Sequence, residues 1–316
     1  MHVKQRQFGC AVILVLLATG FLWADEGDMP MQRAADGGIP HDGPYVHEVW
    51  SARSSDGLVW TIDGQALLQH ASVPMAILQD PNNILIYYVD ASKPGPENTN
   101  VARSTDGGKT FAPLGLSISG MTKRKAVDPC AVHLPDGRIR LYYYGCDASP
   151  DAPGEHEIHS AISSDGVHFR EEGKVFPYSG LVDPDVFWNG AQWVMLVFSL
   201  SDHDTIVATS PDGTHFSYKA PLGIGRYGTV APVRLKDGRF RMYAFGQEGQ
   251  AAFVSFISRD GLNWKAENGT RLTAPQGKEI TDPQALQLPD GSWKMFFKVS
   301  PHTLKKGSHM QMKAPM

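Results

Sequence analysis

One hairpin pattern recurs along this chain and constrains its fold more than any other feature. Its clearest copy spans 127–145, VDPCAVHLPDGRIRLYYYG, where an Asp-Pro pair leads an alternating apolar run, an Asp-Gly turn and a second alternating run. Asp-Gly between two runs of period two is the strongest short-range signal for a β-hairpin. The pattern returns at 73–88, 182–198, 230–245 and 281–297. Copies spaced by about 50 residues are typical of propeller blades.

A second repeated element alternates with these hairpins. It reads Ser-x-Asp-Gly, is followed by an aromatic residue, and is preceded by a short alternating strand. We expect the Ser hydroxyl and the Asp carboxylate to accept turn amides, and the Gly to adopt positive φ. The sequence therefore predicts structural rather than catalytic roles for the Asp residues of these turns, which are Asp56, Asp106, Asp165, Asp212 and Asp260.

The order of the two hairpin types predicts how the fold closes. The chain begins with an unpartnered Ser-x-Asp-Gly hairpin at 46–62 and ends with an unpartnered Pro-led hairpin at 281–299. Five four-stranded blades result only if the N-terminal strands pair with the C-terminal strands, which removes an exposed sheet edge. We therefore expect an all-β, five-bladed β-propeller over 46–300.

The flanking segments predict export. Residues 1–24 combine Lys4 and Arg6 with an apolar run and a small residue, Ala24, at a cleavage position, as in a secretory signal peptide. An uncleaved membrane anchor is the alternative, because the apolar run is near the lower limit for a span. Segment 25–45 reads as a linker, and 301–316 is a tail without a core pattern. We expect a secreted or periplasmic monomer with no membrane span after cleavage.

Charge and cysteine content limit the partners and crosslinks. Loss of the signal moves the formal net charge from −4 to −6, because Lys4 and Arg6 leave with it. This acidity argues against a nucleic-acid partner, which would require a basic face. With a two-residue turn at 136–137, Cys130 and Cys146 point to opposite faces of the hairpin, so a disulfide requires a bulge. A bridge and two free thiols both remain open.

The residues that precede the strand prolines are the candidate site. Alternating strand direction places them on one face of the ring, and they are Val73, Asp128, Asp183, Ala231 and Asp282. A single Asp-Pro pair usually caps its own turn. Three of them at one level of a radial fold bring carboxylates together, which pushes their pKa values apart and suits acid–base chemistry.

Five blades, inner Asp-Pro pairs and outer Ser-x-Asp-Gly turns together resemble the five-bladed propeller glycoside hydrolases of families 43, 62, 32, 68, 117 and 130. The resemblance covers about 46–299 and implies an oligosaccharide or polysaccharide substrate. It makes Asp128 a general base or nucleophile and Asp183 a residue that tunes pKa. Val230 stands where the resemblance implies a catalytic Glu two residues before a Pro. Another group must then supply the proton, and the candidates on the same face are Glu157, His156, Asp204 and Glu248.

Other residues on this face are expected to bind substrate, and they are Asp282, Arg124, Arg226, Tyr227, Trp188 and His156. The run 123–125, Lys-Arg-Lys, could hold an anionic sugar, although a solvated connector is commoner. We expect no cofactor and no metal site made from the His-carboxylate pairs; some family 43 relatives make a calcium ion in the channel conceivable.

Two alternative functions stay open. The turn at 104–111 satisfies the Asp-box of sialidases, and Arg124, Arg226 and Tyr227 lie on the appropriate face, but sialidases resemble six-bladed rings. A non-catalytic carbohydrate-binding propeller keeps the Asp ring and explains Val230 most simply.

Overall fold

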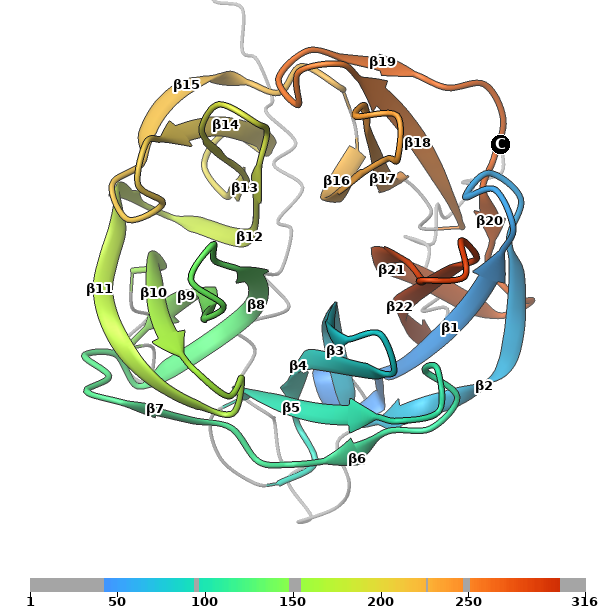
Figure 1. The fold of residues 1–316 in the computed structure, drawn as a ribbon, viewed down its shortest axis with the longest axis horizontal. Helices are drawn as coiled ribbons and strands as arrows, with labels where there is room; N and C mark the ends of the chain where they lie inside the picture. The colour runs from blue at the N-terminus through green and yellow to red at the C-terminus, as the bar shows by residue number, and fades with distance from the viewer. Residues whose placement is uncertain (1–42, 94–96, 148–154, 226, 247–250, 302–316) are drawn as a thin grey trace, which may run out of the picture.

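The computed structural model describes residues 43–93, 97–147, 155–225, 227–246 and 251–301. Apart from a short 3-10 turn at Gly43–Val46, the regular structure in these ranges is β-strand. Five sheets are arranged radially around a central axis, so the protein is a five-bladed β-propeller (Figure 1). In the part of the chain that the structure describes, no helix is long and apolar enough to cross a membrane.

Each blade has one innermost strand beside the axis and three or more strands outside it (Figure 1). Blade 1 contains β3 (Ala71–Asp80), β4 (Asn83–Asp90), β5 (Asn98–Ser104) and β6 (Ala112–Pro113). Blade 2 contains β8 (Lys125–His133), β9 (Ile139–Cys146), β10 (Glu157–Ser163) and β11 (His168–Ser179). Blade 3 contains β12 (Leu181–Trp188), β13 (Trp193–Ser199), β14 (Asp204–Ser210) and β15 (Ser217–Pro221).

Blade 4 contains β16 (Tyr227–Arg234), β17 (Phe240–Gly246), β18 (Ala252–Ser258), β19 (Trp264–Ala266) and β20 (Leu272–Thr273), the last pairing with β18. Blade 5 contains β21 (Lys278–Gln287), β22 (Trp293–Pro301), β1 (Glu48–Ser54) and β2 (Thr61–Gln69).

Blade 5 joins the two ends of the propeller. Strand β1 pairs antiparallel with β22 from Glu48 opposite Val299 to Ser54 opposite Trp293. The earliest and latest strands of the ring therefore share one sheet, whose order is β2-β1-β22-β21 (Figure 1). This pairing covers the inner edge of the β1–β2 hairpin and the outer edge of the β21–β22 hairpin.

One connection adds a strand that the repeat pattern does not predict. Strand β7 (Ser117–Ser119) follows blade 1 but pairs in parallel with β11 of blade 2. The chain thus crosses from one blade to the outer edge of the next before it turns inward to β8 (Figure 1). This strand covers the exposed edge of β11.

The Ser-x-Asp-Gly turns have the predicted hydrogen bonds. In blade 3, Gly213 N donates to Ser210 Oγ at 2.9 Å, while the amides of Thr214 and His215 donate to Asp212 Oδ1 at 2.8 and 3.0 Å. The other turns repeat this pattern around Asp56, Asp106, Asp165 and Asp260. The structural role predicted for these carboxylates is confirmed.

The same turns connect neighbouring blades. Tyr142 Oη in blade 2 donates to the carbonyl of Gly213 in blade 3 at 2.8 Å. Tyr87 contacts the Gly166 carbonyl at 3.0 Å, and Tyr243 contacts that of Gly57 at 2.7 Å. Glycine lets the tyrosine approach, because a Cβ on Gly213 would lie 3.0 Å from Tyr142 Oη. The turn residue therefore serves blade packing as well as backbone conformation.

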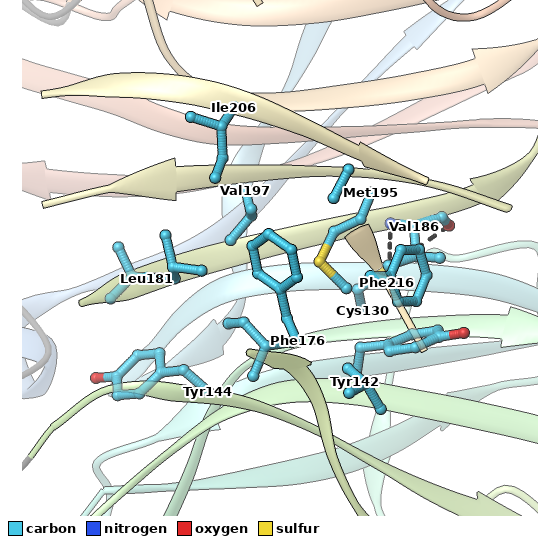
Figure 2. Close-up of a cluster of buried hydrophobic side chains, with 14 of the residues drawn as sticks. Cys130, Tyr142, Tyr144, Phe176, Leu181, Val186, Met195, Val197, Ile206 and Phe216 are labelled. Carbon is cyan, nitrogen blue, oxygen red and sulfur yellow. Dashed lines mark hydrogen bonds between the residues drawn. The ribbon is translucent and has the colours of Figure 1, made fainter. Parts of the chain in front are cut away.

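Apolar side chains from facing sheets fill the space between blades. Figure 2 shows this core between blades 2 and 3, where Tyr142 and Phe176 meet Met195 and Phe216. Cys130 belongs to the same cluster, and its sulfur accepts the Val186 amide at 3.1 Å.

Both described cysteines, Cys130 and Cys146, are buried free thiols, so the disulfide alternative is not formed. Burial raises the pKa of the Cys130 thiol well above its usual value. Cys130 lies opposite Tyr142, whereas a two-residue turn would place it opposite Tyr143. The turn is longer than predicted, since the Leu134 amide bonds the Arg138 carbonyl.

Candidate functional site

The innermost strands share an unusual backbone feature. Each strand has a bulge, and the residue within it is a non-glycine with positive φ. These residues are Val73 (43°), Asp128 (52°), Asp183 (51°), Thr229 (23°) and Asp282 (51°). Such conformations are costly for residues with a side chain and persist only where the surrounding fold imposes them. The propeller therefore presents one strained residue per blade at the same level of the ring.

The fourth member of this set corrects the sequence analysis, which placed Ala231 in it. The register jumps between Gly228 and Val230, so the bulge residue is Thr229. Val230 then occupies the place that Pro has in the other four blades, and Pro232 lies two residues further along the strand. Counting from the proline gave the wrong residue, because the position of the bulge, and not that of the proline, determines which side chain of the strand reaches the pocket.

All five bulge residues line one pocket at the axis. Its volume is about 340 Å³ including solvent at its mouth. A second layer, two residues further along each strand, contributes Met75, Asp185, Ala231 and Gln284 to the lining. Among the described residues that line the pocket, the ionisable side chains are four aspartates. Asp128, Asp183 and Asp282 are thus brought together as predicted, and Asp185 joins them.

Asp183 and Asp282 each have a polar partner from the surrounding strands. Thr229 Oγ1 donates to Asp183 Oδ2 at 3.2 Å across the boundary between blades 3 and 4. Lys298 Nζ lies 3.1 Å from Asp282 Oδ2, and Thr281 Oγ1 donates to the same oxygen at 2.9 Å. These contacts hold both carboxylates in place at the pocket wall.

Asp185 has a different environment. Its Oδ1 lies 4.0 Å from the Cys130 sulfur, and the Gln284 amide donates to its carboxylate. Part of its surface contacts the pocket solvent, but protein encloses it on the other sides. Burial raises the pKa of Asp185 well above its usual value, and the Gln284 hydrogen bond offsets only part of this effect. Sequence reasoning missed Asp185, although its position two residues after Asp183 on one strand was a usable signal.

Glu157, the first candidate for the acid, is not among the described residues that line the pocket. Its carboxylate lies 2.7 Å from Lys174 Nζ and 2.9 Å from Lys123 Nζ. Hydrogen bonds from Lys174 and then Lys123 lower the pKa of Glu157 to about 2. A carboxyl group held ionised in this way is a poor proton donor at neutral pH. Lys123 also pairs with Asp147 at 3.2 Å, so these charges neutralise each other.

Other predicted residues lie around the ring rather than in the pocket lining. His156 is buried against Tyr144, with 4.7 Å between the two ring centroids. Tyr227 packs edge-on against Phe256, with 5.4 Å between the ring centroids. Arg124 is exposed immediately before β8. The structure therefore does not bring these three side chains together with the aspartates.

Trp188 lies at the opposite end of β12 from Asp183, packed against Trp193 at 5.6 Å. Five residues of extended strand correspond to roughly 16 Å, so Trp188 belongs to the other face of the ring. Asp204 begins β14 and is absent from the described pocket lining, while Arg226 and Glu248 fall outside the described residues.

The arrangement of the described His, Cys, Asp and Glu side chains does not indicate a metal site. Within the described ranges, no group of three or more His, Cys, Asp or Glu side chains is arranged to hold a metal ion. The calcium ion suggested by resemblance therefore stays a prediction.

Comparisons with known proteins relate this chain to solved structures. No family model matches it, and no curated protein matches. A Dyadobacter fermentans protein of unknown function is 18% identical, with 85% of this chain and 88% of that chain covered and a TM-score of 0.57. A thermostable family-43 glycoside hydrolase is 12% identical, with coverages of 73% and 88% and a TM-score of 0.55.

A family 117 glycoside hydrolase from Zobellia galactanivorans is 14% identical, with 82% of this chain and 92% of that chain covered and a TM-score of 0.52. At these identities the similarity establishes the fold. The chain has the five-bladed propeller fold of glycoside hydrolases of families 43 and 117.

Proposed function

We propose that this protein is an exported glycoside hydrolase that cleaves a glycosidic bond of an oligosaccharide in the axial pocket. The observation that carries this proposal is the convergence of Asp128 and Asp183, from equivalent bulges of successive blades, on one pocket. Paired carboxylates around a cleavable bond are the usual machinery of glycoside hydrolysis. The shared fold of the family 43 and 117 enzymes supports the same assignment.

Each aspartate has a role consistent with its surroundings. Asp128 is buried at the pocket wall and acts as general base toward water or as nucleophile toward the anomeric carbon. Asp183, held by Thr229, steadies the positive charge that develops on the sugar ring. Asp282, which is paired with Lys298, accepts hydrogen bonds from sugar hydroxyl groups. The separation of the two reacting carboxyl groups will determine inversion or retention.

A non-catalytic carbohydrate-binding propeller is the second candidate. It is favoured by one observation, since the described lining of the pocket contains no glutamate. A sialidase-like enzyme is less well supported, because five sheets form the ring and the described lining contains no arginine.

The test separates these candidates with one panel of oligosaccharides. The purified protein is incubated with each member, products are quantified by chromatography of reducing sugars, and binding is measured by calorimetry. A hydrolase gives new reducing ends that disappear in Asp128→Asn and persist in the surface control Asp147→Asn. Binding without product from the wild type supports the second candidate. Neither binding nor product contradicts both.

A further inference from the structure

The proposed reaction lacks an assigned proton donor. Cleavage of an ordinary glycosidic bond requires a proton on the departing oxygen, and a positioned acid contributes roughly 10²- to 10⁴-fold to such a step. Glu157 is held ionised by two lysines, and Val230 has no proton to give. Among the described residues that line the pocket, the side chains that can carry a proton to the leaving oxygen are the four aspartates.

Three of these aspartates already have a partner or a role in the proposed reaction. Asp282 has a lysine partner at 3.1 Å, and Asp183 accepts a hydrogen bond from Thr229 at 3.2 Å. Asp128 is the base or nucleophile of the proposed reaction and must begin the reaction ionised. Asp185 differs because it contacts the Cys130 thiol and the Gln284 amide, which are both neutral groups.

We propose that Asp185 is the acid catalyst of this pocket and that it protonates the departing glycosidic oxygen. This inference rests on the proposed function. The C1–O bond breaks as the Asp185 proton passes to the leaving oxygen, while Asp128 either removes a proton from the attacking water or bonds to C1 itself. Asp185 ends the step as a carboxylate. Because Asp185 lies one layer further along the channel than Asp183, the leaving oxygen must face that second layer.

The groups that face Asp185 explain how it retains a proton. Strand β8 brings Asp128 and Cys130, its own strand brings Asp183, and β21 brings Asp282 with Lys298 behind it. Strands β3 and β16 bring no titratable side chain to the lining. Burial raises the pKa of Asp185, and the hydrogen bond from Gln284 offsets only part of this effect.

The test compares leaving groups on the sugar that the wild-type protein releases. Asp185→Asn is isosteric and cannot donate an acidic proton, so hydrolysis of the natural glycoside should fall by roughly 10²- to 10⁴-fold. A dinitrophenyl glycoside of the same sugar needs no protonation, and its hydrolysis should stay close to the wild-type rate. The wild type should lose activity at high pH as Asp185 gives up its proton, and Asp185→Asn should not show this loss. A merely structural role would reduce both substrates alike, and that result would overturn the assignment.

A second variant keeps the proposal testable if Asp185→Asn does not fold. Gln284→Leu removes the hydrogen bond that lowers the pKa of Asp185, so the high-pH limit of the natural reaction should move upward. An unchanged limit contradicts the proposal. If the wild type releases no sugar from any substrate, the proposed function itself fails; if only Asp128→Asn is inactive, the Asp185 assignment alone fails.

Discussion

Lys298 Nζ lies 3.1 Å from Asp282 Oδ2, and both side chains are buried beside the axial pocket. Removing one partner of a buried pair leaves a charge in a poorly solvated site, at a cost of about 3 to 5 kcal/mol. Asp282→Asn should therefore lower the free energy of unfolding by about that amount, measured by urea denaturation. The double variant Asp282→Asn/Lys298→Met should recover most of the loss.

The control for this pair is the half-exposed contact between Lys123 and Asp147. Asp147→Asn should change the unfolding free energy by no more than about 1 kcal/mol, as expected for a surface ion pair. Equal effects at Asp282 and Asp147 would show that burial of the Lys298 pair has no energetic consequence.

Glycine substitutions test the contact between blades. Gly166 and Gly137 both have positive φ, at 78° and 86°, but a Cβ on Gly166 would lie 2.7 Å from Leu85 Cδ1, whereas a Cβ on Gly137 has no heavy atom within 4 Å. Gly137→Ala should cost about 1 to 2 kcal/mol for the backbone alone. Gly166→Ala should cost a further 1 to 3 kcal/mol or so from overpacking. Thermal and urea unfolding of the two variants would measure the difference, and equal costs would contradict blade packing through this turn.

Thr229 positions Asp183. Thr229→Val removes the hydroxyl that donates to Asp183 at 3.2 Å while it preserves the shape of the side chain. A hydrogen bond to a charged group contributes about 1.5 to 3 kcal/mol, so kcat should fall by about 10- to 100-fold. Thr229→Ser restores the donor and should recover most of the activity. If the valine and serine variants are equally impaired, the hydroxyl has no role.

Glu157 should contribute to acid stability and not to catalysis. Its pKa is lowered to about 2 by Lys174 and Lys123, against about 4.3 in an unfolded chain. A depressed folded pKa means that the stabilisation is complete above about pH 4.3 and is lost as pH falls toward 2. Glu157→Gln should lower the free energy of unfolding at pH 7 and make it fall less steeply between about pH 4.3 and pH 2. The rate of hydrolysis should stay unchanged. A large loss of activity on natural glycosides would return Glu157 to the position of acid.

Local sequence chemistry was sufficient for the ring but not for the details of the pocket. Alternating runs and Asp-Gly turns depend on neighbours in sequence, so the blades and the roles of residues such as Asp212 could be predicted. Thr229 could not, because the bulge in β16 moved the pocket residue two positions away from the one before Pro232. The difference between Asp185 and Asp282 arises from side chains of other strands, with Lys298 of β22 beside Asp282 and Cys130 of β8 and Gln284 of β21 beside Asp185, and a linear pattern does not reveal these contacts.

Glu157 and Trp188 show the same limit from another direction. Glu157 was placed near the start of its strand, yet Lys123 and Lys174 from neighbouring segments engage its carboxylate. Trp188 was chosen as an aromatic on an inner strand, but strand length puts it at the opposite end from Asp183. The order of the strands predicts the face of the ring on which a residue lies only when its position along the strand is also considered.

The most direct test of the account is the initial rate of reducing-sugar release by the wild type and Asp128→Asn at saturating oligosaccharide. If the axial pocket is the active site, the wild type releases sugar and the variant is slower by at least about 10²-fold while it still binds substrate. Equal rates in the two proteins would contradict the assignment of catalysis to this pocket.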